Sequence, residues 1–93
     1  MYATVRSYTV APGLAEGLEE RASEVTRVIG SIDGFRAYYL IRTAEGAVSV
    51  SVYDTQAGAE ESAKAAAAFL RESLPDLQVG APDVVSGEVV VNA

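Results

Sequence analysis

Residues 35–54 read FRAYYLIRTAEGAVSVSVYD, and this stretch decides the fold. Phe35 to Thr43 and Ala47 to Asp54 are rich in the β-branched and aromatic residues that are typical of strands. Ala44-Glu45-Gly46 joins the two runs, and a short link that contains Gly suits a hairpin. The stretch therefore predicts two antiparallel, neighbouring strands.

A strand and a helix precede the hairpin. Tyr2 to Val10 is rich in Tyr, Thr and Val and stops at Ala11-Pro12-Gly13, where Pro lacks a ladder donor and Gly permits a turn. Apolar residues then recur at helical spacing, with charged residues on the other side. The apolar positions are Leu14, Leu18, Val25, Ile29 and Ile32. The spacing predicts one amphipathic helix that ends between Gly30 and Gly34.

A second helix and a fourth strand follow the hairpin. Thr55 can cap the helix through its hydroxyl, and Pro75 ends it. The inner stripe of this helix is Ala59, Ala63, Ala66, Leu70 and Leu74. Pro75 to Asp83 is expected to be a loop with a short extended piece around Leu77–Val79, and Val84 to Val91 is the fourth strand.

This order of elements, βαββαβ, predicts an α+β protein with the ferredoxin-like fold. Right-handed crossovers place both helices on one face of a four-stranded antiparallel sheet. A chain of 93 residues has room for one compact domain, residues 1–93, and its 49% hydrophobic and 22% charged residues are ordinary for a globular protein.

The composition excludes several classes of partner. The formal net charge of -6 disfavours nucleic acid, because the protein repels phosphate on average. No apolar stretch approaches the ~20 residues that span a bilayer, so we expect no membrane segment. No secretory leader pattern is present and the chain has no Cys, so we expect a cytoplasmic protein.

The composition also restricts the chemistry. The chain has no His, Cys or Trp, which removes a Ser-His-Asp triad, a His-ligated metal and a His-ligated haem. We expect no metal and no cofactor. Glu16, Glu19, Glu20 and Glu24 have spacings that can gather carboxylates around a cation, but a solvated helix face is the expected interpretation.

Alternation along the strands divides the sheet residues into two faces. The valine face comprises Ala3, Val5, Phe35, Ala37, Tyr39, Ile41, Val48, Val50, Val52, Val85, Val89 and Val91. The tyrosine face comprises Tyr2, Thr4, Arg6, Tyr8, Arg36, Tyr38, Leu40, Arg42, Ser49, Ser51, Tyr53, Ser86, Glu88 and Val90. Two helices cover one face only, so a second copy is expected on the other, and the sequence predicts a homodimer. The pattern alone favours the valine face as the one under the helices.

The tyrosine face carries the candidate site. Hydroxyls of Tyr and Ser can hold or protonate a carbonyl or phenol oxygen, and Arg can stabilise an oxyanion or enolate. The candidate catalytic residues are Arg6, Tyr8 and Tyr53, and the candidate substrate-binding residues are Tyr38, Ser49 and Ser51. The alternative is that these groups pair with one another in a mixed polar interface.

Three landmarks suggest a family. They are Val10-Ala11-Pro12-Gly13 after the first strand, Gly34-Phe35 at the start of the second, and Tyr53-Asp54-Thr55 between the third strand and the second helix. With these landmarks and the order of elements, the chain resembles the antibiotic biosynthesis monooxygenase superfamily from about Tyr2 to Val90. The resemblance implies a dimeric α/β-barrel, in which two sheets pack face to face and each subunit has a pocket between sheet and helices.

The resemblance also bears on the site. Arg6 falls about where haem-degrading members carry an Asn that points under the helices, which makes the tyrosine face the pocket and the valine face the dimer seam. The helix Trp and His of those members are missing, so haem degradation is not expected. The resemblance implies a cofactor-independent monooxygenase that acts on a small aromatic or polyketide-like molecule. The alternative is a non-catalytic dimeric module that binds a small ligand or an interaction partner.

Overall fold

The computed structural model describes residues 1–77 and 80–93. Its elements are β1 (Tyr2–Tyr8), α1 (Leu14–Glu20), α2 (Ala22–Gly30), β2 (Phe35–Arg42), β3 (Ala47–Tyr53), α3 (Gln56–Ser73) and β4 (Asp83–Glu88). The extended piece expected around Leu77–Val79 falls mainly on residues 78–79, outside the described residues.

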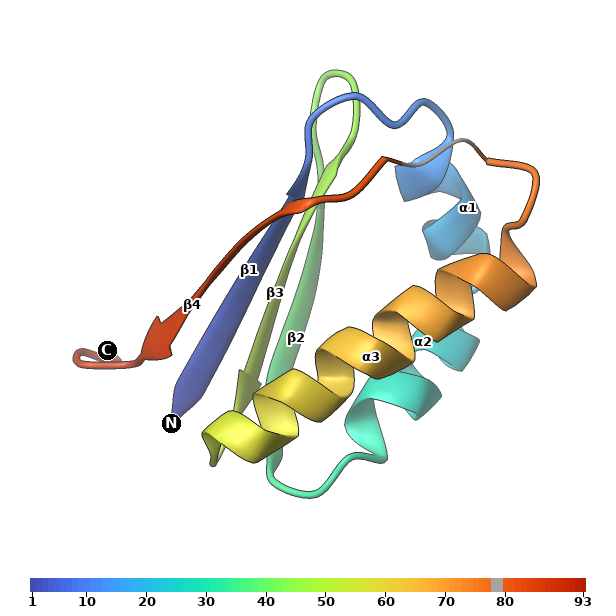
Figure 1. Ribbon diagram of the computed structural model, residues 1–93. Coiled ribbons are helices and arrows are strands. Elements are labelled where there is room, and N and C mark those ends of the chain that lie inside the picture. Colours follow the sequence, from blue (N-terminus) through green and yellow to red (C-terminus); the bar gives the residue numbers. More distant parts are fainter. Residues whose placement is uncertain (78–79) are drawn as a thin grey trace.

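The four strands form one antiparallel sheet in the order β2-β3-β1-β4. The three helices cover one face of this sheet, and the other face has no helix against it (Figure 1). This arrangement confirms the predicted ferredoxin-like α+β fold. The central strand β1 pairs with β3 on one side and β4 on the other, so its side chains lie in the middle of the molecule.

The region predicted as one helix contains two. Arg21 has φ −110° and ψ 27°, outside helical geometry, and it separates α1 from α2. Gly13 begins α1 with φ 85°, a left-handed conformation that Gly adopts without a Cβ penalty. The apolar spacing does not reveal the break, because Leu18 and Val25 are seven residues apart and so fall on one helical face with or without it.

The other elements follow the prediction closely. Thr55 caps α3 as expected, since its hydroxyl oxygen accepts a hydrogen bond from the Gly58 N–H at 3.2 Å. The strand β4 ends at Glu88 instead of Val91. The residues that follow it, Val90 and Val91, are strongly exposed, and the chain end extends beyond the sheet (Figure 1).

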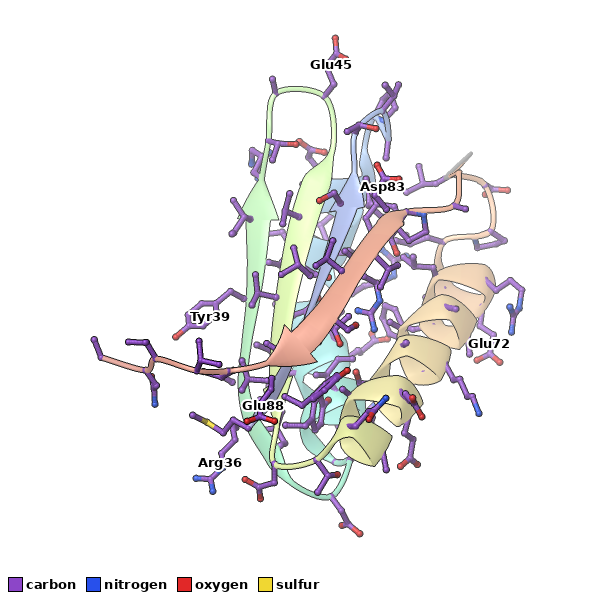
Figure 2. All side chains as sticks on the ribbon, turned by 60° about the vertical axis from the view of Figure 1, so that its left-hand side comes forward. Arg36, Tyr39, Glu45, Glu72, Asp83 and Glu88 are labelled. Atoms are coloured by element: carbon purple, nitrogen blue, oxygen red, sulfur yellow. The ribbon has the colours of Figure 1, made fainter. Side chains whose placement is uncertain are left out.

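The tyrosine face lies under the helices, so the expectation from pattern alone was wrong and the one from the resemblance was right. Along β3 the serines and Tyr53 are buried, whereas the alternating valines are only half-buried. On the opposite side Tyr39 and Val85 are 62% and 70% exposed. Figure 2 shows Tyr39 pointing away from the helices. Small serines permit the helices to come close, and the rings of the tyrosines then fill the layer between.

Phe35 is a correction to the predicted faces. A β-bulge shifts the register between Phe35 and Ala37, so that Phe35 pairs with Tyr53 and joins the helix side. The two rings meet edge to face, with centroids 5.8 Å apart. Simple alternation from Ala37 back to Phe35 cannot anticipate the extra residue, so it assigned Phe35 to the valine face.

Candidate functional site

A small cavity lies between the tyrosine face and the helices. Its volume is about 30 Å³, room for about two water molecules. Its surface is almost entirely apolar. The sheet contributes the polar residues of the lining, and α1, α2 and α3 contribute most of the apolar ones. The lining residues are Arg6, Tyr8, Leu18, Val25, Val28, Ile29, Tyr38, Leu40, Ser49, Ala66, Phe69 and Leu70. We call it the helix-side cavity.

Arg6 is the charged residue of this cavity. It lies on the central strand β1, opposite Ser49 of β3 and Val84 of β4, and only 4% of it is exposed. Its Nη2 atom is buried and has no hydrogen-bond partner among residues 1–77 and 80–93. The ion pairs among the described residues involve Arg36 and Arg42 and none involves Arg6. A buried cation without a partner is costly, so its presence calls for a reason.

Tyr8 and Tyr38 provide two hydroxyls on the same wall. Burial raises the pKa of both phenols above the ordinary value of 10.0, and the nearby positive charge of Arg6 opposes that rise. Both groups are therefore protonated and neutral near pH 7, and their hydroxyls can donate hydrogen bonds to a ligand oxygen.

Tyr53 lies outside the cavity lining. Its hydroxyl donates a hydrogen bond to the Ile29 carbonyl oxygen at 2.7 Å, and the residue is fully buried. Burial raises its pKa, and the nearby Ser62 hydroxyl and the charge of Arg6 oppose that rise. The hydroxyl joins β3 to α2, so its geometry is that of a structural contact.

The two candidate serines differ in their position relative to the cavity. Ser49 lines the cavity, whereas Ser51 is fully buried between Thr4 and Tyr38 in the sheet register and lies outside the lining. The Ser51 hydroxyl has no partner among the described residues. Of the six candidate residues, the cavity thus brings together Arg6, Tyr8, Tyr38 and Ser49, and it leaves out Ser51 and Tyr53.

A wider groove adjoins the cavity between β2 and the helices α1 and α2. Its volume is about 280 Å³, and it shares Leu18, Val25, Tyr38 and Leu40 with the cavity lining. At its rim the Arg42 guanidinium lies 2.5 Å from a Glu16 carboxylate oxygen and 3.2 Å from one of Glu19. The Glu16 and Glu19 carboxylates of α1 therefore face a cation that the protein itself provides, the Arg42 guanidinium.

Sequence reasoning missed part of the apolar wall. Val28 and Phe69 line the cavity beside the predicted stripes of α2 and α3. Their only signal is that each is apolar and adjoins a stripe residue, Ile29 or Leu70, so the apolar sector of each helix is wider than the predicted stripe.

Residues 1–77 and 80–93 hold no group of three or more His, Cys, Asp or Glu side chains placed to bind a metal ion. None of their helices is both long enough and apolar enough to cross a bilayer.

A family comparison identifies the class of protein that this fold and cavity define. Residues 1–72 match the family model for antibiotic biosynthesis monooxygenase. The match covers most of the chain, so the chain belongs to the antibiotic biosynthesis monooxygenase family. A search of curated protein sequences found no significant match.

Solved structures show the same fold at low sequence identity. The haem degrader MhuD from Mycobacterium tuberculosis, with two haems in its active site, has a TM-score of 0.73 and 17% identity over 100% of this chain and 99% of its own. SnoaB from Streptomyces nogalater, a cofactor-independent oxygenase, has a TM-score of 0.62 and 14% identity over 98% and 92%. A dimeric ferredoxin-like protein from an uncultured marine organism has a TM-score of 0.60 and 14% identity over 99% and 94%.

Proposed function

We propose that this protein is a cofactor-independent monooxygenase that acts on a small aromatic or polyketide-like molecule. The observation that carries the proposal is the helix-side cavity, whose lining includes the buried Arg6 together with Tyr8 and Tyr38. Membership of the family supports it, as does the fold shared with SnoaB, a cofactor-independent oxygenase.

In such a reaction the substrate supplies the electrons. An anthrone loses a proton from its CH₂ group, and the resulting enolate reduces O₂ and forms a C–O bond. The hydroperoxide then loses water to leave a quinone, so one oxygen atom enters the product and the other leaves in water. Arg6 stabilises the enolate oxygen, and the two tyrosine hydroxyls hold that oxygen by hydrogen bonds.

The cavity lining holds no carboxylate or imidazole that could act as a general base. The substrate proton must therefore pass to water, which requires that the bound substrate become more acidic. A positive charge beside an acidic group lowers its pKa, and burial strengthens that effect by reducing screening. Arg6 is placed to lower the pKa of a bound phenol or enol in this way.

The same observation supports a second candidate, a non-catalytic module that binds a small ligand. A lining with hydrogen-bond donors and apolar side chains, and without a proton acceptor of ordinary strength, is sufficient for binding. The two candidates differ in whether a bound substrate consumes oxygen.

Haem fits this site poorly. A cavity of about 30 Å³ is far smaller than a porphyrin, and the chain has no His or Cys to bind the iron. Haem degradation, which MhuD carries out, is therefore not proposed for this chain.

We also propose a homodimer formed through the valine face, in a cytoplasmic protein. Val85, Val5, Val50 and Tyr39 form one row across all four strands, on the side that no helix covers. The similar fold of a dimeric ferredoxin-like protein supports this arrangement. A second copy would remove this apolar row from water.

An oxygen electrode tests the proposed reaction. Purified protein is mixed with anthrone or a quinol in air-saturated buffer, and the quinone is followed by its absorbance. We expect one O₂ consumed per anthrone, and a rate that falls at least about tenfold in Arg6→Met. Arg27→Met, on the exposed side of α2, is the matched control and should keep the wild-type rate. Ligand binding without oxygen uptake above the buffer rate would support the binding module instead.

A further inference from the structure

We propose that the helix-side cavity binds the carboxylate group of an aromatic or otherwise apolar acid, with Arg6 as its counter-ion. The inference rests on the proposed function in using the same site, and it adds the chemical class of the ligand: an acid that is ionised before it binds.

The charge of Arg6 is permanent. An arginine guanidinium stays protonated in proteins, so Arg6 carries its charge whether or not a ligand is bound. Within the described part of the chain, its Nη2 atom is buried without a hydrogen-bond partner and no carboxylate pairs with this side chain. An oxyanion that exists only during a reaction cannot compensate this charge in the complex that precedes it. A ligand that arrives as an anion can.

The neighbours of Arg6 on the cavity lining are neutral hydrogen-bond donors. Tyr8 and Tyr38 lie close enough for its charge to act on their ionisation, and burial keeps both phenols protonated. They cannot neutralise the guanidinium as tyrosinates near pH 7. They can, however, donate hydrogen bonds to the oxygens of a carboxylate that already faces Arg6.

The size of the cavity also fits a carboxylate. Its volume is about 30 Å³, the room that about two waters would need, and the head group of an acid is of similar size. The adjoining groove holds about 280 Å³ and shares Leu18, Val25 and Leu40 with the cavity. Movement of these apolar side chains would join the two spaces. The apolar body of the ligand would then lie in the groove while the carboxylate reaches Arg6.

The groove does not offer a competing cation. Arg42 lies at its rim, but its guanidinium already has the carboxylates of Glu16 and Glu19 as partners. Within the described residues that line the cavity or the groove, Arg6 is therefore the cation without a carboxylate partner.

A matched pair of ligands tests the inference. Naphthoate carries a carboxylate, and naphthamide is a neutral molecule of nearly the same shape. Calorimetric titration of the protein under nitrogen at pH 7 separates binding from any oxygen chemistry. We expect naphthoate to bind about 10- to 100-fold more tightly than naphthamide, as for hydrogen bonds to a buried charge.

Variants then assign the preference to Arg6. Arg6→Met should bind both ligands equally, and Arg6→Lys should keep part of the preference because it keeps the charge. Arg27→Met, with its exposed side chain, should keep the full preference. Thermal unfolding of each variant shows whether it is folded. If Arg6→Met does not fold, the wild-type ratio and Arg6→Lys decide.

Equal affinities for the acid and the amide in the wild type would overturn the inference, as would a preference that survives in Arg6→Met. This outcome is separable from failure of the proposed reaction. Anthrone oxidation without a carboxylate preference would contradict the carboxylate inference and leave the proposed reaction standing. A carboxylate preference without oxygen uptake would contradict the proposed monooxygenase reaction and leave the carboxylate inference standing.

Discussion

The Tyr53 hydroxyl donates a hydrogen bond of 2.7 Å to the backbone carbonyl oxygen of Ile29, and so joins β3 to the last turn of α2. Neither residue is more than 2% exposed. Because Ile29 also lines the helix-side cavity, this contact sets the position of one cavity wall without placing the phenol inside the cavity.

Tyr53→Phe should therefore lower stability and leave ligand preference intact. The variant leaves the buried Ile29 carbonyl without this donor, which costs about 1–3 kcal/mol in the free energy of unfolding. Urea denaturation followed by circular dichroism measures the change. The control is Thr26→Ala, which removes an exposed hydroxyl from the same helix and should change stability by less than about 0.5 kcal/mol. A loss of naphthoate binding in folded Tyr53→Phe would show that the phenol acts on the ligand.

The buried tyrosines predict a loss of stability in alkali. Burial raises the pKa of Tyr8 and Tyr38 above 10.0, so near that pH the unfolded chain releases these protons while the folded chain still holds them. Their contribution to the free energy of unfolding is complete below pH 10 and is lost as the pH rises through the folded-state pKa values.

Tyr38→Phe should flatten this alkaline decline relative to the wild type. Melting temperatures measured from pH 8 to pH 11 provide the test, and below pH 9 the two curves should run parallel. A decline that is equally steep in the variant would show that Tyr38 does not contribute to it.

The order of the elements and most of their ends could be predicted from the sequence, because Gly and Pro end elements and Thr55 caps a helix through local backbone effects. The sheet face under the helices could not be predicted from the strand pattern, and only the family resemblance pointed to the right one. A valine-rich strand face is typical of a core, and only the packing shows that Ser49, Ser51 and Tyr53 provide the helix side. The sequence also could not predict that Arg6 has no ion-pair partner among the described residues, because that depends on which carboxylates lie nearby in space.

The bulge at Phe35 and the break at Arg21 were hidden for another reason. Each depends on a single residue whose backbone departs from its neighbours, and the hydrophobic pattern on either side remains compatible with regular structure.

Val50→Glu tests the proposed dimer seam. Val50 lies between Val5 and Tyr39 on the uncovered face, so a buried charge there would oppose association of two sheets. Sedimentation at micromolar concentration should show a dimer for the wild type and a monomer for this variant. Ala57→Glu, which adds the same charge on an exposed position of α3, should remain dimeric. A wild type that sediments as a monomer contradicts the seam outright.

Gly46→Ala tests the packing of the hairpin loop against β1. A Cβ at residue 46 would collide with the Tyr8 carbonyl group, which is backbone and cannot rotate away. We expect a loss of about 1–3 kcal/mol in the free energy of unfolding. Gly80→Ala is the control, because a Cβ there meets no atom within 4 Å. Equal stability of the two variants would mean that the loop can move away from Tyr8.

The most direct test of where the ligand binds is a crystal structure of the protein with naphthoate. We expect the naphthoate carboxylate within hydrogen-bond distance of the Arg6 guanidinium, beneath the helices, with the rings extending toward Leu18 and Leu40. Naphthoate seated on the valine face, or density for the ligand away from Arg6, would contradict this assignment.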